Sequence, residues 1–456
     1  MDLDVEVLVI GGGMAGLVAG TIAAENGLNT LILRKGQGAT AHSSGAVDVM
    51  GYLPATLIPF STPIEGLQLV TEIHPFHPYG MFAFQEPQTD NILTRVIESV
   101  RAPIEWLQDK LNDSIAPLYG SFESNISPIT VLGTTKPTCL VQETMWNGGL
   151  TETDDSVLLF AGFRGHPDFH PSVASKAFLE RQMQRREPPH KVGHCIVDIA
   201  PHGKQYNVSS IELARHFDHD SSLAELVDAL KKHVDQLGAT HVALPPVLGI
   251  ESSVENVKLL QKELGSTVFE LLAFPPSVPG LRLQKALDNM YLQAGGRLLI
   301  GHEVVSGSIE GRQVTKVKAR SPRRSLEVRP KAVVLATGKF IGGGIAGDRN
   351  GFRETVFGLM AVTGEFYSAA EALPLRQTNT LALSPRGQPF LGSGLSVDAA
   401  FRPIDHEGEY AAENLFCAGS VLAGHSFSSE KSGLGVSLSM GYAVGHYAKG
   451  IVKEVG

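Results

Sequence analysis

Cysteine is scarce in this chain, and its three cysteines (Cys139, Cys195 and Cys417) lie far apart in the sequence. No CxxC pair occurs, so a self-contained iron–sulfur or zinc-ribbon site is not expected, and a disulfide framework is excluded. Isolated thiols of this kind are typical of a protein in a reducing cytosol.

Long apolar runs and an excess of basic charge are also missing. No stretch reaches the roughly 20 apolar residues that a membrane-spanning helix needs. Asp2, Asp4 and Glu6 carry the wrong charge for a secretory signal peptide. With 38 Lys and Arg against 47 Asp and Glu, the net charge is −9. Because nucleic-acid binders usually carry a basic field, we expect no nucleic-acid partner.

Glycine and apolar residues are what the chain has in quantity. Its 456 residues include 49 glycines, and 43% are hydrophobic while 19% are charged. This balance excludes disorder as the general state of the chain. At roughly 100–200 residues per domain, the length predicts two or three domains with ample core.

The first thirty residues carry the clearest structural pattern. Residues 5–10 are a short β-branched run that predicts a buried parallel strand, 17–26 predict a helix, and 29–33 predict a second strand. Strand, helix and strand within about thirty residues are typical of a dinucleotide-binding half-fold.

A glycine turn joins the first predicted strand to the helix. Gly11, Gly13 and Gly16 form a G-x-G-x-x-G pattern, with Met14 and Ala15 between the last two. The first glycine allows the tight turn, the second lets a phosphate approach the backbone, and the third lets helix and strand pack closely. The helix N-terminus then offers N–H groups and a positive dipole to an anion. The sequence therefore predicts a phosphate-bearing cofactor at this turn, with a ligand-free turn as the weaker alternative.

The acidic residue that usually follows such a turn is absent. About 20 positions on, where a carboxylate would bind the adenosine ribose, the chain has Arg34 and Lys35. Arg34 could meet the 2′-phosphate of NADP, or the adenosine half could be missing, as in a mononucleotide flavin. A solvated basic turn is the third interpretation.

Two late segments favour a flavin over NADP. A hydrophobic strand starting at 332 is followed by Thr337 and Gly338, and a strand at 414–418 is followed by Gly419 and Ser420 in a loop rich in glycine and serine. This order resembles the flavoprotein pattern. The helix predicted to follow, from Gly433 and Leu434, directs its positive N-terminus toward the expected flavin ring.

These segments belong to a wider resemblance. It is carried by G-G-G-M-A-G at 11–16, H-S-S-G-A-V-D at 42–48, F-P-P-S-V-P-G-L-R-L-Q at 274–284, and the block 414–435. On these motifs the chain resembles the B subunits of the anaerobic glycerol-3-phosphate dehydrogenases. That family is related more distantly to the flavoproteins of fumarate reductase and succinate dehydrogenase. The resemblance is faintest across residues 85–270.

The resemblance implies a flavin-dependent enzyme made of three subunits. The cofactor of this subunit would be FMN, with FAD as the alternative. The partners would be a flavoprotein, the A subunit, and an iron–sulfur protein, the C subunit, which attaches the complex to the cytoplasmic face of the membrane. The complex would oxidise glycerol 3-phosphate and pass electrons to quinone in anaerobic respiration. Ser43, Ser44 and Gly45, in the second motif, are also expected to contact the cofactor.

Candidate catalytic residues are fewer. Arg349, Arg353 and Arg282 could bind a substrate phosphate, because guanidinium groups match phosphate oxygens. An ion pair with Asp348 or Glu354 is the structural alternative. His425, in the loop near the expected ring, could move a proton from a substrate hydroxyl.

No metal site is expected. The histidine pairs at 166/170 and 190/194 have i, i+4 spacing but lie beside prolines, and no H-E-x-x-H pattern occurs.

Two other functions stay open. One is an electron-relay or scaffold subunit without a substrate site, and the other is a fumarate-reductase-like enzyme acting on a dicarboxylate.

We therefore expect a doubly wound α/β flavoprotein fold with a discontinuous flavin-binding domain at 1–55, 275–345 and 411–456. Residues 56–274 are predicted as an inserted α/β region and 346–410 as a small cap.

Overall fold

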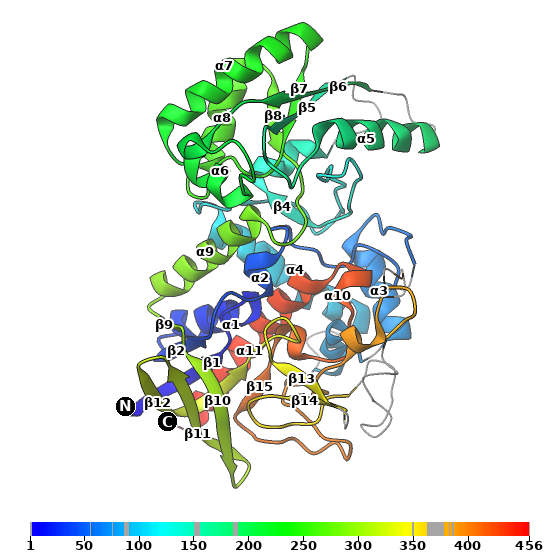
Figure 1. Cartoon of the computed structure of the whole chain (residues 1–456). Coiled ribbons are helices and arrows are strands. Elements are labelled where there is room, and N and C mark those ends of the chain that lie inside the picture. Colours follow the sequence, from blue (N-terminus) through cyan, green and yellow to red (C-terminus); the bar gives the residue numbers. More distant parts are fainter. Residues whose placement is uncertain are drawn as a thin grey trace. The chain divides into compact units, whose positions relative to one another are not determined.

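The computed structural model describes residues 2–54, 56–74, 76–85, 91–149, 156–185, 190–348, 351–362, 378–382, 384 and 387–455. These residues fall into two compact units, which are described separately (Figure 1). Unit 1 comprises 1–40, 47–110 and 284–456, and unit 2 comprises 41–46 and 111–283.

Unit 1 contains a seven-stranded sheet with a parallel centre. Its path runs β10-β11-β12-β1-β2-β9, and β15 pairs with β12 beside this path. The strands that pair in parallel are β1 (Asp2–Ile10), β2 (Thr30–Arg34), β9 (Arg297–Ile300), β12 (Arg324–Leu335) and β15 (Leu415–Cys417). Strands β10 (Glu303–Glu310) and β11 (Gln313–Ser321) pair antiparallel with each other. Strand β11 also pairs antiparallel with the first half of β12.

Two helices of unit 1 pack against each other and against this sheet: α1 (Met14–Glu25) and α11 (Gly433–Val455) (Figure 1). Glycines make the close approach possible. A Cβ at Gly441 would lie 2.5 Å from the Ala15 carbonyl oxygen, and one at Gly445 would lie 2.9 Å from the Ala19 carbonyl oxygen. Neither position therefore accepts a larger side chain without moving the helices apart.

The remaining elements of unit 1 are shorter or peripheral. They are α3 (Pro63–Ile73), η1 (Pro78–Phe84), α4 (Ile92–Leu111), the hairpin β13 (Ile345–Asp348) with β14 (Gly351–Glu354), η5 (Pro389–Gly392), η6 (Gly419–Val421) and α10 (Phe427–Glu430). Helix α9 (Val278–Gln293) belongs to unit 1 from Gln284 onward, and α2 (Ala39–His42) contains the boundary between Thr40 and Ala41.

Unit 2 has a sheet of its own, with four parallel strands in the order β6-β5-β7-β8. The strands are β5 (Val157–Phe163), β6 (Lys191–Val197), β7 (His241–Leu244) and β8 (Thr267–Glu270). Helices connect them: α5 (Pro171–Arg185), α6 (Ser210–Phe217), α7 (Asp220–Leu237) and α8 (Ser253–Leu264). The hairpin β3 (Leu118–Gly120) with β4 (Leu140–Gln142) and the turns η2 (Glu143–Gly148) and η3 (Pro201–Gly203) complete the unit.

The predicted α/β dinucleotide-binding fold is confirmed. β1, α1 and β2 form the expected N-terminal βαβ unit, in which Val7 to Ile10 pair with Thr30 to Leu33 in parallel. The alternation of strands and helices predicted for the inserted region is also present in unit 2. A helix joins β1 to β2, and a helical crossover of this kind is what brings two successive strands into parallel.

The compact units divide the chain differently from the predicted domains. Residues 56–110, expected in the inserted region, cluster with unit 1, and so do the described residues of the expected cap at 346–410. Helix α4 explains part of this, because Val96, Val100, Ile104 and Leu107 are each 0% exposed. The module boundaries drawn from sequence stay a prediction, since compactness alone does not define a module.

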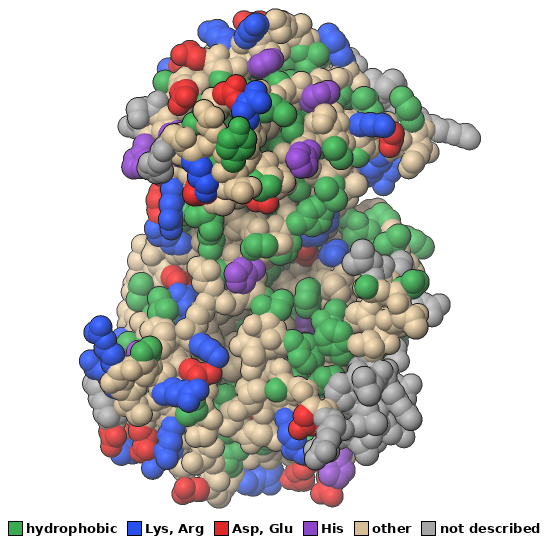
Figure 2. All heavy atoms as spheres, viewed as in Figure 1, with side chains coloured by type: hydrophobic (Ala, Val, Ile, Leu, Met, Phe, Trp, Pro, Cys, Tyr) green, Lys and Arg blue, Asp and Glu red, His purple; other side chains and the backbone are tan. Residues whose placement is uncertain are grey.

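Within the described residues, no helix is both long enough and apolar enough to pass through a bilayer. On the face seen in Figure 2, acidic and basic side chains are interspersed.

Candidate functional site

The glycine turn after β1 is packed so tightly that side chains cannot replace its glycines. Gly11 has a φ of +112°, and a Cβ there would lie 2.2 Å from the Ala336 carbonyl oxygen. A Cβ at Gly16 would lie 2.0 Å from the Gly11 carbonyl oxygen. The turn is thereby pressed against the end of β12 and the first turn of α1, as the G-x-G-x-x-G pattern predicts.

Backbone donors at this turn fit an anionic group. The Met14 N–H donates to the Thr40 hydroxyl at 2.9 Å. Among the described residues, no acceptor faces the N–H groups of Gly12 and Gly13. Gly13 is the N-cap of α1 and has no side chain to cap the helix itself. Free N–H groups at a helix N-terminus are what a phosphate needs.

The basic residues at the end of β2 have partners within the chain. The Arg34 guanidinium forms two hydrogen bonds to Asp288, at 2.7 and 2.8 Å, and one to the Gly12 carbonyl at 3.2 Å. Gln284 donates to the same carbonyl and to Asp288. Lys35 pairs with Glu303 at 2.7 Å. Arg34 is only 7% exposed, so the interpretation as a solvated turn is wrong for it. Contact of either cation with a cofactor stays a prediction.

Two of the predicted late segments meet the turn in unit 1. Gly419, with a φ of +79°, starts η6, and a Cβ there would lie 2.8 Å from the Ala15 Cβ. A Cβ at Gly338 would lie 3.9 Å from the Ser420 hydroxyl. The structure therefore brings together three segments that lie far apart in the sequence.

The Thr337 hydroxyl is a buried side-chain atom in this group that lacks a hydrogen-bond partner in the described chain. Buried polar groups in folded proteins almost always have one. An unpartnered hydroxyl beside the glycine turn at 11–16, here called the glycine cradle, fits a site for a polar ligand. The phosphate and ribityl hydroxyls of a flavin are groups of this kind, so the residues present fit a flavin.

The start of α11 is held by other parts of unit 1. The Gly435 N–H donates to the Asp48 carbonyl at 2.9 Å, and a Cβ at Gly433 would lie 3.0 Å from the Phe427 Cβ. Leu434 lies within the first turn. The predicted contact of Gly433 and Leu434 with a flavin ring is not tested by these packing contacts.

Ser43, Ser44 and Gly45 belong to unit 2. Gly45 has a φ of +77°, and a Cβ there would lie 2.6 Å from the Gln142 side-chain nitrogen. Ser43 accepts a 2.6 Å hydrogen bond at its carbonyl from the Ser277 hydroxyl. Their predicted role at the cofactor stays a prediction.

A buried group of ionisable side chains surrounds the predicted catalytic residue His425. Four side chains in unit 1 take part, each 6% exposed or less: His77, Lys339, His425 and Glu430. The Tyr79 N–H donates to His77 Nδ1 at 3.1 Å, so His77 Nε2 carries the proton and donates to Glu430 at 3.2 Å. Glu430 also accepts from the Ser426 N–H and the Ser432 hydroxyl, each at 2.8 Å.

His425 differs from its neighbours because neither ring nitrogen has a partner in the described chain. Its ring lies edge-on to the His77 ring, with centroids 6.0 Å apart. Burial, with the nearby Lys339 as the next cause, holds the pKa of His425 well below its ordinary range. The imidazole is therefore neutral at pH 7 and offers a lone pair to a proton donor.

Lys339 follows directly on Thr337 and Gly338. Its Nζ donates to the Leu391 carbonyl at 2.5 Å. Burial lowers the pKa of Lys339 to about 7, against a partial opposing effect from Glu430. Burial alone would raise the pKa of Glu430, but the hydrogen bonds from His77 and its other donors hold it below the ordinary range. The group thus contains a carboxylate that stays ionised and a lysine poised between two protonation states.

The three arginines expected at a substrate phosphate have different outcomes. Arg353 lies on β14 with an exposed side chain, which donates a 3.4 Å hydrogen bond to the Gly358 carbonyl. Arg349 lies outside the described residues.

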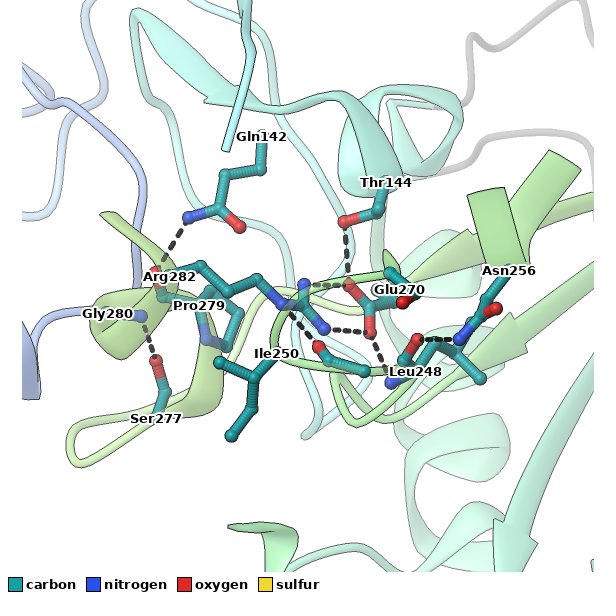
Figure 3. Close-up of polar contacts among 12 residues, drawn as sticks. Gln142, Thr144, Leu248, Ile250, Asn256, Glu270, Ser277, Pro279, Gly280 and Arg282 are labelled. Carbon is teal, nitrogen blue, oxygen red and sulfur yellow. Dashed lines mark hydrogen bonds and ion pairs between the residues drawn. The ribbon is translucent and has the colours of Figure 1, made fainter. Parts of the chain in front are cut away.

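Arg282 cannot bind a substrate from its position. Both it and Glu270 have side chains that are 0% exposed, and they form a two-pronged ion pair at 2.5 and 2.9 Å in unit 2 (Figure 3). Arg282 also donates to the Gly249 carbonyl at 2.8 Å. The phosphate role is contradicted, and the partner is neither of the two carboxylates expected from sequence.

Sequence reasoning missed His77, Lys339 and Glu430. Lys339 directly follows the Thr337-Gly338 motif, so its position next to a glycine loop could have indicated it. Glu430 lies five residues after His425. His77 had no signal, because 353 residues separate it from Glu430.

Three of the four histidines considered for a metal have a serine partner. His166, His190 and His194 lie within 3.0–3.4 Å of Ser210, Ser156 and Ser175 respectively. Of the residues that the structure describes, no three His, Cys, Asp or Glu side chains gather as a metal site would require.

Comparison with known proteins adds a sequence family. The model of the family described as FAD binding domain matches residues 6–436. The B subunit of the anaerobic glycerol-3-phosphate dehydrogenase of Vibrio vulnificus (strain CMCP6) is 30% identical over 458 residues, covering 98% of this chain and 97% of the relative. The probable B subunit of the same enzyme from Halobacterium salinarum (strain ATCC 29341 / DSM 671 / R1) is 29% identical, covering 98% of both chains.

Solved structures are similar only in a general way. Quinol fumarate reductase of E. coli superposes with a TM-score of 0.40 at 11% identity, covering 100% of this chain and 72% of that one. The 3-ketosteroid-delta4-(5alpha)-dehydrogenase of Rhodococcus jostii RHA1 also has a TM-score of 0.40, at 14% identity, covering 98% of this chain and 97% of that one. At such scores the fold rests on the strand order given above.

Proposed function

We propose a function for this chain, which belongs to the FAD binding domain family and to the B-subunit family of the anaerobic glycerol-3-phosphate dehydrogenases. It is a flavin-holding subunit of a complex that oxidises sn-glycerol 3-phosphate to dihydroxyacetone phosphate. The electrons pass through a flavoprotein A subunit and an iron–sulfur C subunit to a membrane quinone. The chain lies on the cytoplasmic side and reaches the membrane through those subunits.

The observation that carries this proposal is the unpartnered polar surface around the glycine turn. Gly12 and Gly13 offer N–H groups without acceptors, and the buried Thr337 hydroxyl has no partner among the described residues. In folded proteins such groups are nearly always satisfied. A flavin supplies a phosphate and hydroxyls for these atoms and, when bound, accepts the two electrons of an alcohol oxidation.

The chain's own residues suit the proton part of that reaction. Oxidation of a secondary alcohol removes a hydride from carbon and a proton from the hydroxyl oxygen. Neutral His425 has a free lone pair for that proton. Lys339, with a pKa of about 7, is the nearby group that exchanges protons at working pH.

FMN is the proposed cofactor, and the pairing of Arg34 supports it. In the adenosine-binding pattern, the end of β2 carries a carboxylate for the ribose. Here that position is an arginine whose terminal nitrogens are bonded to Asp288. The matched family is described by FAD, so FAD is the alternative.

Cofactor release tests this choice. The purified chain is denatured with acid, the flavin is identified by chromatography, and the apoprotein is titrated with FMN and FAD. We expect FMN to be released and to bind more tightly. Removing both side chains in Arg34→Ala/Asp288→Ala opens the end of β2 and should improve FAD binding relative to FMN. Tighter binding of FAD by the wild-type chain would contradict the FMN assignment.

The second candidate is a relay subunit that holds flavin without a substrate site. The position of Arg282 favours this second candidate. Its buried side chain is paired with Glu270 within unit 2, so it cannot bind a substrate phosphate. Dye reduction by glycerol 3-phosphate with the isolated flavin-loaded chain separates the two candidates. Turnover supports the dehydrogenase, whereas no turnover until the flavoprotein A subunit is added supports the relay. A parallel assay with fumarate tests the dicarboxylate alternative.

A further inference from the structure

A pocket of unit 1 shares no residue with the predicted flavin site. It has a volume of about 490 Å³ and lies among the strands β1, β2 and β9 and the turn that joins β11 to β12. Pockets of roughly 300–1,000 Å³ are typical of small-molecule sites. Nothing in the proposed function uses it.

The apolar part of the pocket is aliphatic throughout. It consists of Pro322, four leucines and an isoleucine: Leu3, Leu31, Leu299, Ile300 and Leu326. Leu31 and Leu326 are 1% and 4% exposed, whereas Ile300 is 58% exposed at the entrance. No Phe, Tyr or Trp is among the described residues that line the pocket. A nucleotide base or another flat ring would therefore find no stacking surface here, whereas a flexible alkyl chain would find matching contacts.

The polar part of the pocket is basic. Arg297, His302, Arg323 and Arg324 line it, and no acidic residue of the described chain does. Arg323 and Arg324 are exposed and have no ion-pair partner among the described residues. Arg297 donates to an uncharged partner, Asn29, at 2.9 Å. A cationic lining is unexpected on a chain with a net charge of −9.

We propose that this pocket binds an alkyl chain that ends in a carboxylate or phosphate, the chemistry of a fatty acid or an alkyl phosphate. The leucines hold the chain and the arginines at the turn hold the anionic end. Guanidinium groups suit both anions because their paired N–H groups match carboxylate and phosphate oxygens. One end of the pocket adjoins β2, since the His302 N–H donates to the Arg34 carbonyl at 3.1 Å.

Calorimetry with decanoate tests the proposal on the full chain. We expect one decanoate per chain, and at least tenfold weaker binding of decyltrimethylammonium, which has the same chain but the opposite charge. Binding should weaken with salt, because exposed charges are screened. No saturable binding of decanoate, or equal binding of both probes, would overturn the proposal.

Variants at exposed positions locate the site. Arg323→Glu/Arg324→Glu reverses the charge at the turn, and Ile300→Glu places an anion at the entrance; each should weaken decanoate binding at least tenfold. Lys231→Glu/Lys232→Glu makes the same charge change on exposed residues of α7 and should leave binding unchanged. Equal loss in the control would show a non-specific charge effect and contradict the site.

Two further arms separate other occupants. Flotation with phosphatidylglycerol vesicles but no one-to-one decanoate binding would assign the turn to a membrane surface and overturn the pocket. Displacement of decanoate by ADP or FAD would make the pocket part of the cofactor site and likewise overturn it. Loss of flavin binding, by contrast, affects only the proposed function.

Discussion

Unit 1 and unit 2 each bury a group of charged side chains, and the two groups differ in how well they are satisfied. In unit 2, the Glu270 carboxylate accepts from Arg282, from the Thr144 hydroxyl at 2.6 Å and from the Leu248 N–H at 2.8 Å (Figure 3). In unit 1, the group around Glu430 leaves both nitrogens of His425 without partners in the described chain.

This difference separates a structural network from a functional one. A fully bonded buried ion pair gains nothing from a ligand, because every group has a partner already. Unpartnered buried groups cost free energy in the free protein and recover it when a ligand arrives. We therefore expect changes in unit 2 to affect stability and changes in unit 1 to affect binding and proton exchange.

The largest expected effect is on the ion pair of unit 2. Arg282→Met leaves Glu270 buried without its cation, which should lower the free energy of unfolding by about 3–5 kcal/mol. Arg282→Met/Glu270→Leu removes both charges and should cost less than the single change. Denaturant unfolding measures both variants. A single variant as stable as the wild type would mean that the pair is not essential to unit 2.

The next effect tests the glycine cradle of unit 1. Gly13 has an extended backbone that valine can adopt, but a Cβ there would lie 3.2 Å from the Thr40 hydroxyl and beside the free N–H groups. Gly13→Val should weaken flavin binding roughly 100-fold or more, about 2.7 kcal/mol. Gly36→Val is the matched control, since a Cβ at Gly36 meets nothing within 4 Å. Flavin fluorescence titration compares the two, and equal affinities would place the cofactor elsewhere.

The third effect concerns Lys339 and tests whether burial of its charge destabilises the fold of unit 1. Its pKa is about 7 in the folded chain and 10.5 in the unfolded one. Between these values the unfolded chain holds more protons, so the free energy of unfolding should rise with pH from about 7 to 10.5. Lys339→Met should raise stability at pH 7 by about 2 kcal/mol, because removing the buried charge outweighs losing the bond to Leu391.

The shape of the pH dependence decides the lysine prediction. In Lys339→Met the rise above pH 7 should disappear. Glu430 acts at lower pH: its lowered pKa stabilises the fold above the ordinary carboxyl range, and that stability should be lost on acidification. Wild type and Lys339→Met should therefore lose stability alike in acid, whereas a rise above pH 7 that persists in Lys339→Met would contradict the assignment to this lysine.

The smallest effect compares one threonine in each unit. Thr144 donates to Glu270, so Thr144→Val should cost about 1–2 kcal/mol of stability. The Thr337 hydroxyl has no partner in the described chain, so Thr337→Val should change stability by less than about 0.5 kcal/mol and weaken flavin binding instead. Thermal unfolding of the flavin-free proteins measures the stability of both variants. Equal losses of stability in the two variants would contradict the difference proposed between the units.

Much of the fold could be predicted because its signals are local. The run at 5–10, the glycines after it and the apolar helix appear as β1, the turn and α1. The α/β character predicted for the inserted region is also present, in helices α7 and α8 and strands β5 to β8. Helix α4 was missed, since Pro103 interrupts its sequence; its inward stripe at 96, 100, 104 and 107 follows the helical repeat in spite of that proline.

Much of the site could not be predicted, because it depends on which distant residues meet. The sequence by itself determined that a strand, a glycine turn and a helix stand at the start of the chain, since these follow from neighbouring residues. It also placed Thr337, Gly338, Gly419 and His425 in loops. Only the tertiary structure decided that Arg34 would pair with Asp288, that Arg282 would be buried against Glu270, and that His77 would meet Glu430. The physical reason is that a charge buried by folding must find its partner in space, and the position of that partner along the chain is not constrained.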